Sequence, residues 1–195
     1  MGRGHRIQEP GGIYHVASRG NNGETLVHDD IDRVTWLAML ERVVSISGWQ
    51  LLAYCLMTNH YHLALTLATG EDALSCGMQR LNTRYAHYAN GRHGRTGHLF
   101  RNRFFSVPLE SDAHLLETSR YVVLNPVRAG LCAAPEEWAW SSYRACAGLE
   151  HAPRFLDLRG TLELFAPDPT KAFRLYRKFV SDGHVPARRV RCQTP

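Results

Sequence analysis

Residues 51–67 read LLAYCLMTNHYHLALTL. Two apolar runs, at about 50–57 and 60–67, lie on either side of the polar pair Thr58-Asn59, which predicts two neighbouring strands of a covered sheet. Side chains alternate across a strand, so His60 and His62, two residues apart, should project from the same sheet face. This stretch therefore predicts both the sheet and a pair of imidazoles held on it.

Two imidazoles on one rigid face have the geometry of a metal site. Each neutral ring offers one nitrogen lone pair, and the pair can bind a divalent ion while leaving other positions open for substrate and water. For an isolated His-x-His the alternative is a pair of satisfied or surface histidines at a strand end. The rest of the sequence has to distinguish the two.

The elements on either side of this strand pair follow from periodicity and turn residues. Residues 13–18 alternate as a strand that ends in the turn formers 19–23. A helix follows, capped by Asp29 or Asp30 and stopped by Gly48, with apolar side chains at Ile31, Val34, Leu37, Leu40, Val43 and Val44. Residues 71–88 predict a second helix, ended by Asn90-Gly91, with the stripe Leu74, Met78, Leu81 and Tyr85.

Residues 104–109 predict another strand, and Ser111 or Asp112 can cap a third helix. Pro126 should end that helix near Asn125, because the residue before proline is disfavoured in helical conformation. The apolar side of this helix comprises Leu115, Leu116, Val122 and Val123. The whole order predicts an α+β sandwich with a mostly antiparallel sheet and packed helices.

Beyond residue 130 the prediction is a helical extension. A short helix at 135–143 has Pro135 at its first position, and an amphipathic helix at about 171–180 precedes a basic end at 187–191. We assign residues 1–149 to a catalytic domain and residues 150–195 to a C-terminal helical appendage with a basic tail.

Composition narrows the class of protein. A chain of 195 residues can bury a sizeable core without a metal. No apolar run approaches a membrane span and residues 1–6 do not resemble a signal peptide, so we expect a cytoplasmic protein with no membrane partner. The five cysteines have no Cys-x-x-Cys spacing, which argues against disulfides or a thiolate zinc site.

The net charge of +5 favours a polyanionic partner, although many proteins that never bind nucleic acid share such an excess. Lysine occurs only at Lys171 and Lys178, so nearly all the basic side chains are arginines, which suit phosphate contacts. Genome base composition explains the same bias equally well.

Three further stretches accompany the histidine pair. They are IYHV at 13–16 followed by Arg19-Gly20, GHLFRNRF at 97–104, and SRYVVLNPVRAG at 119–130. Together with His60-Tyr61-His62 they resemble the REP-associated tyrosine transposases, single-tyrosine members of the HUH (His, hydrophobic, His) class of DNA-strand transferases. The resemblance runs from about Ile13 to about Tyr143 and implies a ferredoxin-like core.

The resemblance implies that Tyr121 is the nucleophile, which would store the energy of a DNA ester as a 5′-phosphotyrosine. Asn125 lies one helical turn further on and could direct its amide oxygen at the same ion as His60 and His62. This donor set suits Mg²⁺ or Mn²⁺, and zinc stays an alternative. Without the resemblance, Tyr121 would be read as a packing residue and Asn125 as a helix C-cap.

The expected partner is single-stranded or hairpin-forming repeat DNA, bound by a monomer or homodimer. Residues 92–105 mix basic and aromatic side chains, and the DNA-binding candidates are Arg92, Arg95, Arg101 and Arg103. For Phe104 and Phe105 we favour a core-facing role over base stacking. His15, Tyr54 and His98 are interpreted as packing residues near the site.

Small departures from the family pattern leave the metal and nucleophile positions filled but put sequence preference in doubt. Tyr61 is larger than the usual aliphatic, Phe100-Arg101 stands where Trp-Gln is common, and Thr58-Asn59 replaces a frequent Pro-Asn or Pro-Glu. The leading function is a metal-dependent nuclease and transposase. The alternatives are a domesticated hairpin-binding regulator without transposition and a hydrolase that activates water, although the latter would need carboxylate ligands that the sequence lacks near the histidines.

Overall fold

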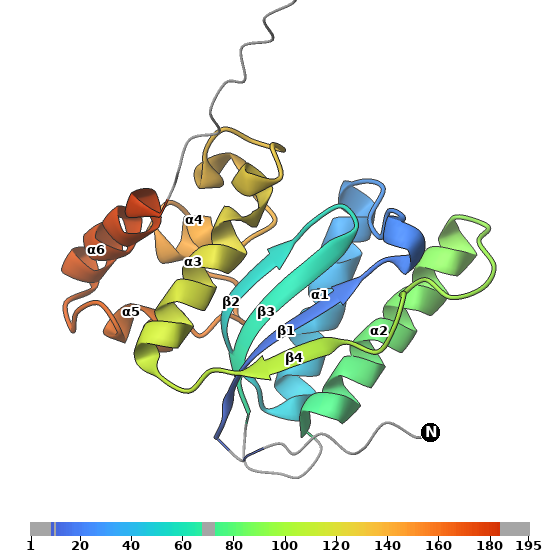
Figure 1. The fold of residues 1–195 in the computed structure, drawn as a ribbon, viewed down its shortest axis with the longest axis horizontal. Helices are drawn as coiled ribbons and strands as arrows, with labels where there is room; N and C mark the ends of the chain where they lie inside the picture. The colour runs from blue at the N-terminus through green and yellow to red at the C-terminus, as the bar shows by residue number, and fades with distance from the viewer. Residues whose placement is uncertain (1–8, 10, 68–72, 184–195) are drawn as a thin grey trace, which may run out of the picture.

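The computed structural model describes residues 9, 11–67 and 73–183. Its centre is a four-stranded antiparallel sheet in the order β2-β3-β1-β4 (Figure 1). The strands are β1 Ile13–Arg19, β2 Gln50–Leu56, β3 His60–Thr66 and β4 Phe105–Pro108. The predicted α+β class and antiparallel sheet are confirmed.

The strand pair predicted from residues 51–67 is the hairpin β2–β3. Its register places Cys55 opposite His62 and Leu56 opposite Tyr61. The Met57 N–H donates to the His60 carbonyl at 2.8 Å and closes the turn. Every residue of β2 except Gln50 is buried, because helices cover both faces here.

One face of the sheet is covered by α1 (Asp30–Ser47) and α2 (Ala73–Arg92), which lie behind it in Figure 1. Both predicted caps of α1 are confirmed: the Asp29 side chain accepts from the Asp32 N–H, and Gly48 adopts a left-handed φ of 62°. The stripe predicted for α2 is also correct, since its four members are fully buried.

The apolar stripe predicted for α1 is wrong at its start. Ile31 and Val34 are 62% and 58% exposed, whereas Asp32 and Trp36 are fully buried. The buried face of the helix contains Asp32 and Trp36 and continues through Leu40, Val43 and Val44. The helix is therefore rotated about its axis relative to the prediction. Burying a carboxylate is tolerated here because it has charged partners, described below.

The opposite face is covered over β2 and β3 by α3 (Asp112–Arg128), which is capped by Ser111 and packs on these two strands. The predicted end near Asn125 is wrong, because Pro126 lies inside the helix. A proline removes only the hydrogen bond of its own nitrogen, and the Ala129 N–H still donates to the Asn125 carbonyl at 2.9 Å. Tyr121 and Asn125 therefore share one continuous helix.

After α3 come η2 (Pro135–Glu137), α4 (Tyr143–Cys146), α5 (Leu158–Glu163) and α6 (Pro169–Asp182). The expected helix at 135–143 is a short 3-10 turn followed by a separate helix from Tyr143, whereas α6 matches the amphipathic prediction. Tyr176 and Val180 are buried in the main core, and the Thr161 hydroxyl donates to the Leu52 carbonyl at 2.8 Å. The basic end at 187–191 lies outside the described residues.

None of the helices described is both long and apolar enough to cross a bilayer.

Candidate active site

The candidate site lies where α3 crosses the sheet. His60 and His62 project from the same face of β3, as predicted, and their ring centroids lie 5.1 Å apart with the planes nearly perpendicular. His15 comes from the neighbouring strand β1, and Tyr121 and Asn125 come from α3. The two imidazoles, the amide and the phenol proposed from the sequence are thus brought together.

Burial keeps the two imidazoles of β3 uncharged. It is the main cause that lowers the pKa of His62 to about 3, with His15 and His60 adding to the effect. Burial also lowers the pKa of His60, aided by Arg19 and opposed by the contact with Asn125. Both rings are therefore neutral near pH 7 and keep a lone pair for binding a cation.

Asn59 fixes the orientation and tautomer of His60. The Asn59 amide nitrogen donates to the Gly23 carbonyl at 3.0 Å, which turns its amide oxygen toward the His60 ring. That oxygen lies 2.7 Å from His60 Nδ1, so Nδ1 carries the proton and donates it. The lone pair of His60 is consequently on Nε2.

This tautomer makes the contact between His60 and Asn125 informative. His60 Nε2 and Asn125 Oδ1 lie 3.3 Å apart. Both are acceptors when His60 is neutral with its proton on Nδ1. A cation would satisfy both lone pairs at once, and Asn125, which is buried, has little access to water as a substitute.

His15 contacts the imidazole of His62. Its Nε2 lies 3.0 Å from His62 Nδ1, and the two rings stack with centroids 5.1 Å apart. One of these nitrogens donates to the other, which leaves His62 Nε2 as its outward nitrogen. Burial, and then the charge of His114, lower the pKa of His15.

Tyr121, on α3, lies next to the imidazoles of His62 and His15. Its ring centroid lies 5.5 Å from that of His62 and 6.1 Å from that of His15, edge to face in both cases. The residue is 40% exposed, which does not suit a plain packing role. The Arg128 guanidinium lies 5.2 Å from the centroid of the Tyr121 ring.

The donor set fits a divalent cation that prefers mixed nitrogen and oxygen ligands. Within the described part of the chain, no group of three or more His, Cys, Asp or Glu side chains is arranged to hold a metal. The candidate set therefore consists of the imidazoles of His60 and His62 and the amide oxygen of Asn125. The C-cap reading of Asn125 is excluded, because α3 continues to Arg128 and Ala129 is its C-cap.

The sequence profile of the family described as "Transposase IS200 like" matches residues 10–125, more than half of the chain. The chain belongs to this family. The match includes both histidines of the pair, Tyr121 and Asn125. No curated protein matches the sequence at a significant level.

One solved structure supports the fold of this IS200-like family member. A REP-associated tyrosine transposase bound to a REP hairpin superposes with a TM-score of 0.67 at 16% identity, over 80% of this chain and 94% of the other. A Deinococcus radiodurans R1 protein described provisionally as a transposase has a TM-score of 0.43 at 16% identity, over 60% and 92% of the two chains. A tRNA(His) guanylyltransferase from Saccharomyces cerevisiae has a TM-score of 0.49 at 9% identity, over 91% and 81%. The last two scores lie below 0.5, so the shared fold is shown by the first structure alone.

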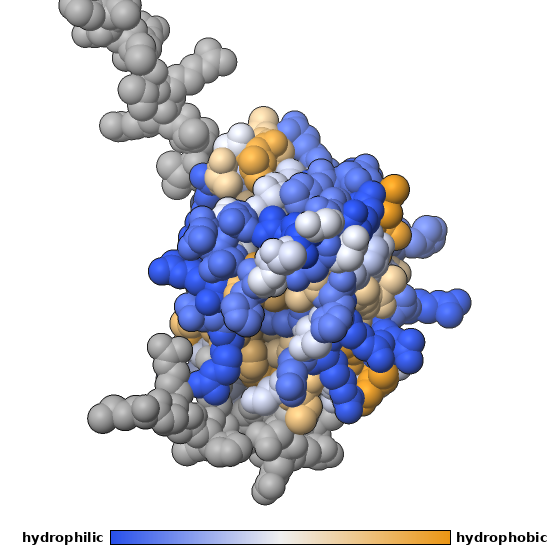
Figure 2. All heavy atoms as spheres, turned by 90° about the vertical axis from the view of Figure 1, so that its right-hand side faces the viewer, coloured by the Kyte–Doolittle hydropathy of each residue, from blue (hydrophilic) through white to orange (hydrophobic). Residues whose placement is uncertain are grey.

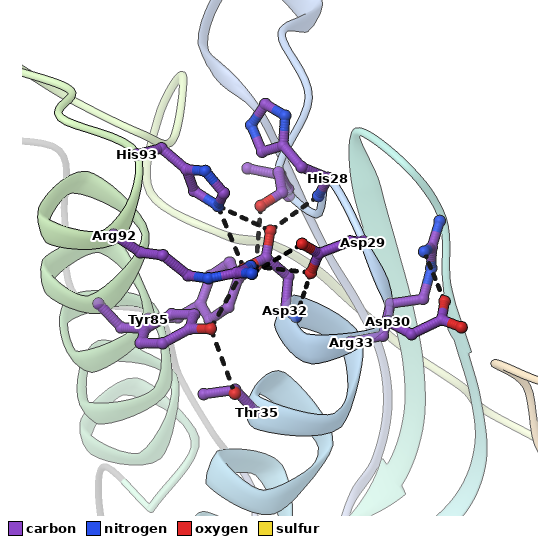
Figure 3. Close-up of polar contacts among 11 residues, drawn as sticks. His28, Asp29, Asp30, Asp32, Arg33, Thr35, Tyr85, Arg92 and His93 are labelled. Carbon is purple, nitrogen blue, oxygen red and sulfur yellow. Dashed lines mark hydrogen bonds and ion pairs between the residues drawn. The ribbon is translucent and has the colours of Figure 1, made fainter.

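Of the four arginines suggested for DNA binding in this family member, two are held by carboxylates. Arg92 pairs with Asp29 at 2.7 Å and with Asp32 (Figure 3). Arg95 pairs with Glu24. The other two, Arg101 and Arg103, are exposed and have no ion pair among the described residues. They line a groove of about 970 Å³ between α2 and residues 97–104. Figure 2, which faces the α2 side, shows mainly hydrophilic side chains there.

The pairs of Arg92 belong to a network around the buried Asp32 that joins the start of α1 to the end of α2 (Figure 3). Asp32 accepts from the His28 N–H at 2.8 Å, from His93 at 2.9 Å and from Arg92. Burial alone would raise the pKa of Asp32, but these donors outweigh it and the net pKa is lowered. Arg92 thus has two carboxylate partners, Asp29 and Asp32, at the start of α1.

Sequence reasoning missed several neighbours of the site. Asn59 was noted only as a departure from the family pattern, and His15 was interpreted as packing. Arg128 was not singled out, and Arg19, opposite His60 on β1, was treated only as part of a motif and a turn. The position of Arg128 seven residues after Tyr121, two helical turns on, is a signal that could have indicated it.

Tyr54 is buried against Phe155, and His98 is exposed beside the groove.

Proposed function

We propose that this chain is a metal-dependent nuclease and strand transferase for single-stranded DNA. It would act through a covalent 5′-phosphotyrosine on Tyr121, on repeat DNA that folds into hairpins. The observation that carries the proposal is the approach of the Tyr121 ring to within 5.5 Å of His62, from an element far away in the sequence. Membership of the IS200-like transposase family supports the same reaction class.

His60, His62 and Asn125 are the residues that would hold a divalent cation, Mg²⁺ or Mn²⁺. When bound, the cation would neutralise the charge that builds up on the phosphate and so stabilise the transition state by several kcal/mol. The protein's own contribution is to keep both imidazoles neutral and to fix the tautomer of His60 through Asn59. Arg128 and Arg19 add positive charge at the rim of the site.

The reaction conserves bonds and protons. The Tyr121 phenolic oxygen forms a bond to phosphorus, and the bond from phosphorus to the 3′ oxygen of the preceding nucleotide breaks. The electron pair leaves on that 3′ oxygen, which gains a proton in place of the one lost by the phenol. Because one phosphodiester is exchanged for another, a 3′ hydroxyl can later reverse the step and reseal a strand without a nucleotide triphosphate.

The DNA partner is proposed from the chemistry of the surface and from a structural relative. The relative with a TM-score of 0.67 is described as bound to a REP hairpin. In this chain, Arg101 and Arg103 are exposed and have no ion pair among the residues described, so they are free to contact phosphates. Both features favour a hairpin with an unpaired flank as the substrate.

Covalent trapping tests this function against its two rivals. Purified full-length chain is incubated with labelled single-stranded hairpins from its own genomic flanks, with and without Mn²⁺, and run on a denaturing gel. A transferase leaves DNA attached to protein. A regulator shifts DNA only in a native gel, and a hydrolase releases product without attachment, so either pattern would contradict the proposal.

Asn59 is predicted to be a positioning residue. Asn59→Ala removes the acceptor for His60 Nδ1–H and should weaken Mn²⁺ binding by about 10- to 100-fold, measured by titration calorimetry without DNA. Asn59→Asp keeps an acceptor and should retain most of the affinity. Asn90→Ala is the matched control, because Asn90 also bonds a loop carbonyl but lies away from the site. Equal Mn²⁺ affinity for Asn59→Ala and the wild type would refute this role.

The arginines should separate into two groups. Arg101→Ala or Arg103→Ala should each reduce the slope of log K against log salt for DNA binding by about 1, without changing the melting temperature. Arg92→Ala should lower the melting temperature, because Asp32 loses a charged partner, and leave the salt slope unchanged. A changed slope for Arg92→Ala, or none for Arg101→Ala and Arg103→Ala, would reverse this assignment.

A further inference from the structure

In the described part of the chain, helices cover the β2 and β3 side of the sheet face that carries the histidines. α3 packs on β2 and β3, while β1 and the edge strand β4 lie beyond it. The strand registers place four residues in one row across this face: Cys55, His62, Ala17 and Phe105. The row runs from beneath α3 to the open edge of the sheet.

Phe105 is the unusual member of the row. It is 55% exposed, whereas its chain neighbour Phe104 points to the other face and is 8% exposed. The Phe105 ring meets His15 edge to face, with centroids 6.2 Å apart. The expectation that Phe105 faces the core is therefore wrong: pairing with Ala17 turns its side chain onto the face of the candidate site.

The residue between Phe105 and His62 in this row is Ala17, which is small and half-buried. Ala17 has one methyl group, and it separates the two larger side chains by two strand spacings, about 10 Å in all. The small Ala17 side chain therefore lies between His62 and the exposed ring of Phe105. Flat aromatic groups suit such a place, since one of their faces can stack on Phe105.

We propose that Phe105 is the stacking platform for an unpaired nucleobase next to the phosphate that is cleaved. This inference rests on the proposed function. With the phosphate at the histidines, α3 closes the side toward β2, so the attached base has its open route across Ala17 to Phe105. Stacking on phenylalanine tolerates every base, so Phe105 contributes affinity and position rather than sequence readout.

The test combines changes in the protein with changes in the DNA. Equilibrium binding of a labelled hairpin with an unpaired flank is measured for full-length wild type and for Phe105→Ala and Phe105→Trp. Each unpaired nucleotide of the flank is replaced in turn by an abasic site. Ile46→Ala is the matched control, because Ile46 is also 55% exposed but lies on α1, on the other side of the sheet.

Phe105→Ala is expected to weaken binding between about 5-fold and 150-fold, Phe105→Trp to preserve it, and Ile46→Ala to change nothing. At one flank position, the abasic site should weaken binding by the wild type by the same factor as Phe105→Ala does with intact DNA. The same abasic site should not weaken binding by Phe105→Ala any further. The proposal is overturned if the two losses multiply at every position, or if Phe105→Trp binds as weakly as Phe105→Ala.

The same oligonucleotides, incubated with Mn²⁺ and run on a denaturing gel, keep the two proposals apart. A covalent adduct without coupling between Phe105 and any base overturns the stacking platform and leaves the nuclease function standing. Coupling without an adduct supports base stacking and contradicts strand transfer. Absence of DNA binding by the wild type overturns both.

Discussion

Replacing Tyr121 by phenylalanine is expected to abolish covalent capture of DNA, with a loss of at least about a thousandfold in adduct formation. The substitution removes one oxygen atom, which is the atom proposed to bond to phosphorus. Tyr121 is 40% exposed, so the free energy of unfolding should change by no more than about 0.5 kcal/mol. Adduct is quantified on a denaturing gel with labelled hairpin DNA and Mn²⁺.

Two comparisons make the result specific. DNA binding by Tyr121→Phe, measured by anisotropy, should equal that of the wild type. Tyr88→Phe removes a hydroxyl that bonds to Asp32 at 3.2 Å on the other side of the sheet, and it should form adduct normally even if it melts earlier. Undiminished adduct with Tyr121→Phe would rule out the phenol as the nucleophile.

Replacing His62 by alanine is expected to reduce metal-dependent cleavage by roughly a hundredfold to a thousandfold. The imidazole is buried and neutral, so it offers a lone pair and competes with no proton near pH 7. His60→Ala should act in the same direction, because His60 Nε2 faces Asn125. Cleavage rates are measured across a Mn²⁺ titration, alongside the Mn²⁺ affinity of each variant without DNA.

The control for this series is His98→Ala, which removes an exposed imidazole beside the groove and should leave Mn²⁺ affinity unchanged. Melting curves confirm that each variant is folded, and His62→Gln provides a second variant that fills the buried space better than alanine. Cleavage that continues at the wild-type rate in chelator would show that the histidine pair has no metal-dependent role.

The parts of the fold that could be predicted are those that depend on the local spacing of apolar residues. The apolar runs around His60 and His62 specify β2 and β3 because a continuous apolar run is typical of a strand that is buried on both faces. The meeting of Tyr121 and Asn125 on one helix face follows from their spacing of four residues. The approach of that helix to β3 depends on long-range packing, and only the family resemblance implied it.

Errors arose where tertiary contacts override local preference. Asp32 occupies a buried position in α1 that hydropathy assigns to Ile31 or Val34, because Arg92 and His93 from α2 supply its partners. Pro126 remains inside α3 because its neighbours are buried and the next hydrogen bonds are kept. The helix α5 has only six residues, too few to show a periodic pattern.

Side-chain roles were harder to predict than elements. Arg92 and Arg95 resemble Arg101 and Arg103 in the sequence, and only the positions of Asp29, Asp32 and Glu24 separate the two groups. Asn59 acquires its role from the Gly23 carbonyl, which orients its amide toward His60. Phe104 and Phe105 are adjacent phenylalanines on opposite faces, and the register with β1 decides which of them meets the site.

The most direct test of the account is to identify the residue that becomes attached to DNA. Wild-type chain is incubated with its hairpin substrate and Mn²⁺, the adduct is digested with nuclease and trypsin, and the modified peptide is sequenced by mass spectrometry. Trypsin cuts after Arg120 and Arg128, and the peptide between them contains Tyr121 as its single tyrosine. The account predicts a nucleotide attached to that tyrosine, and attachment to any other residue, or no attachment at all, would contradict it.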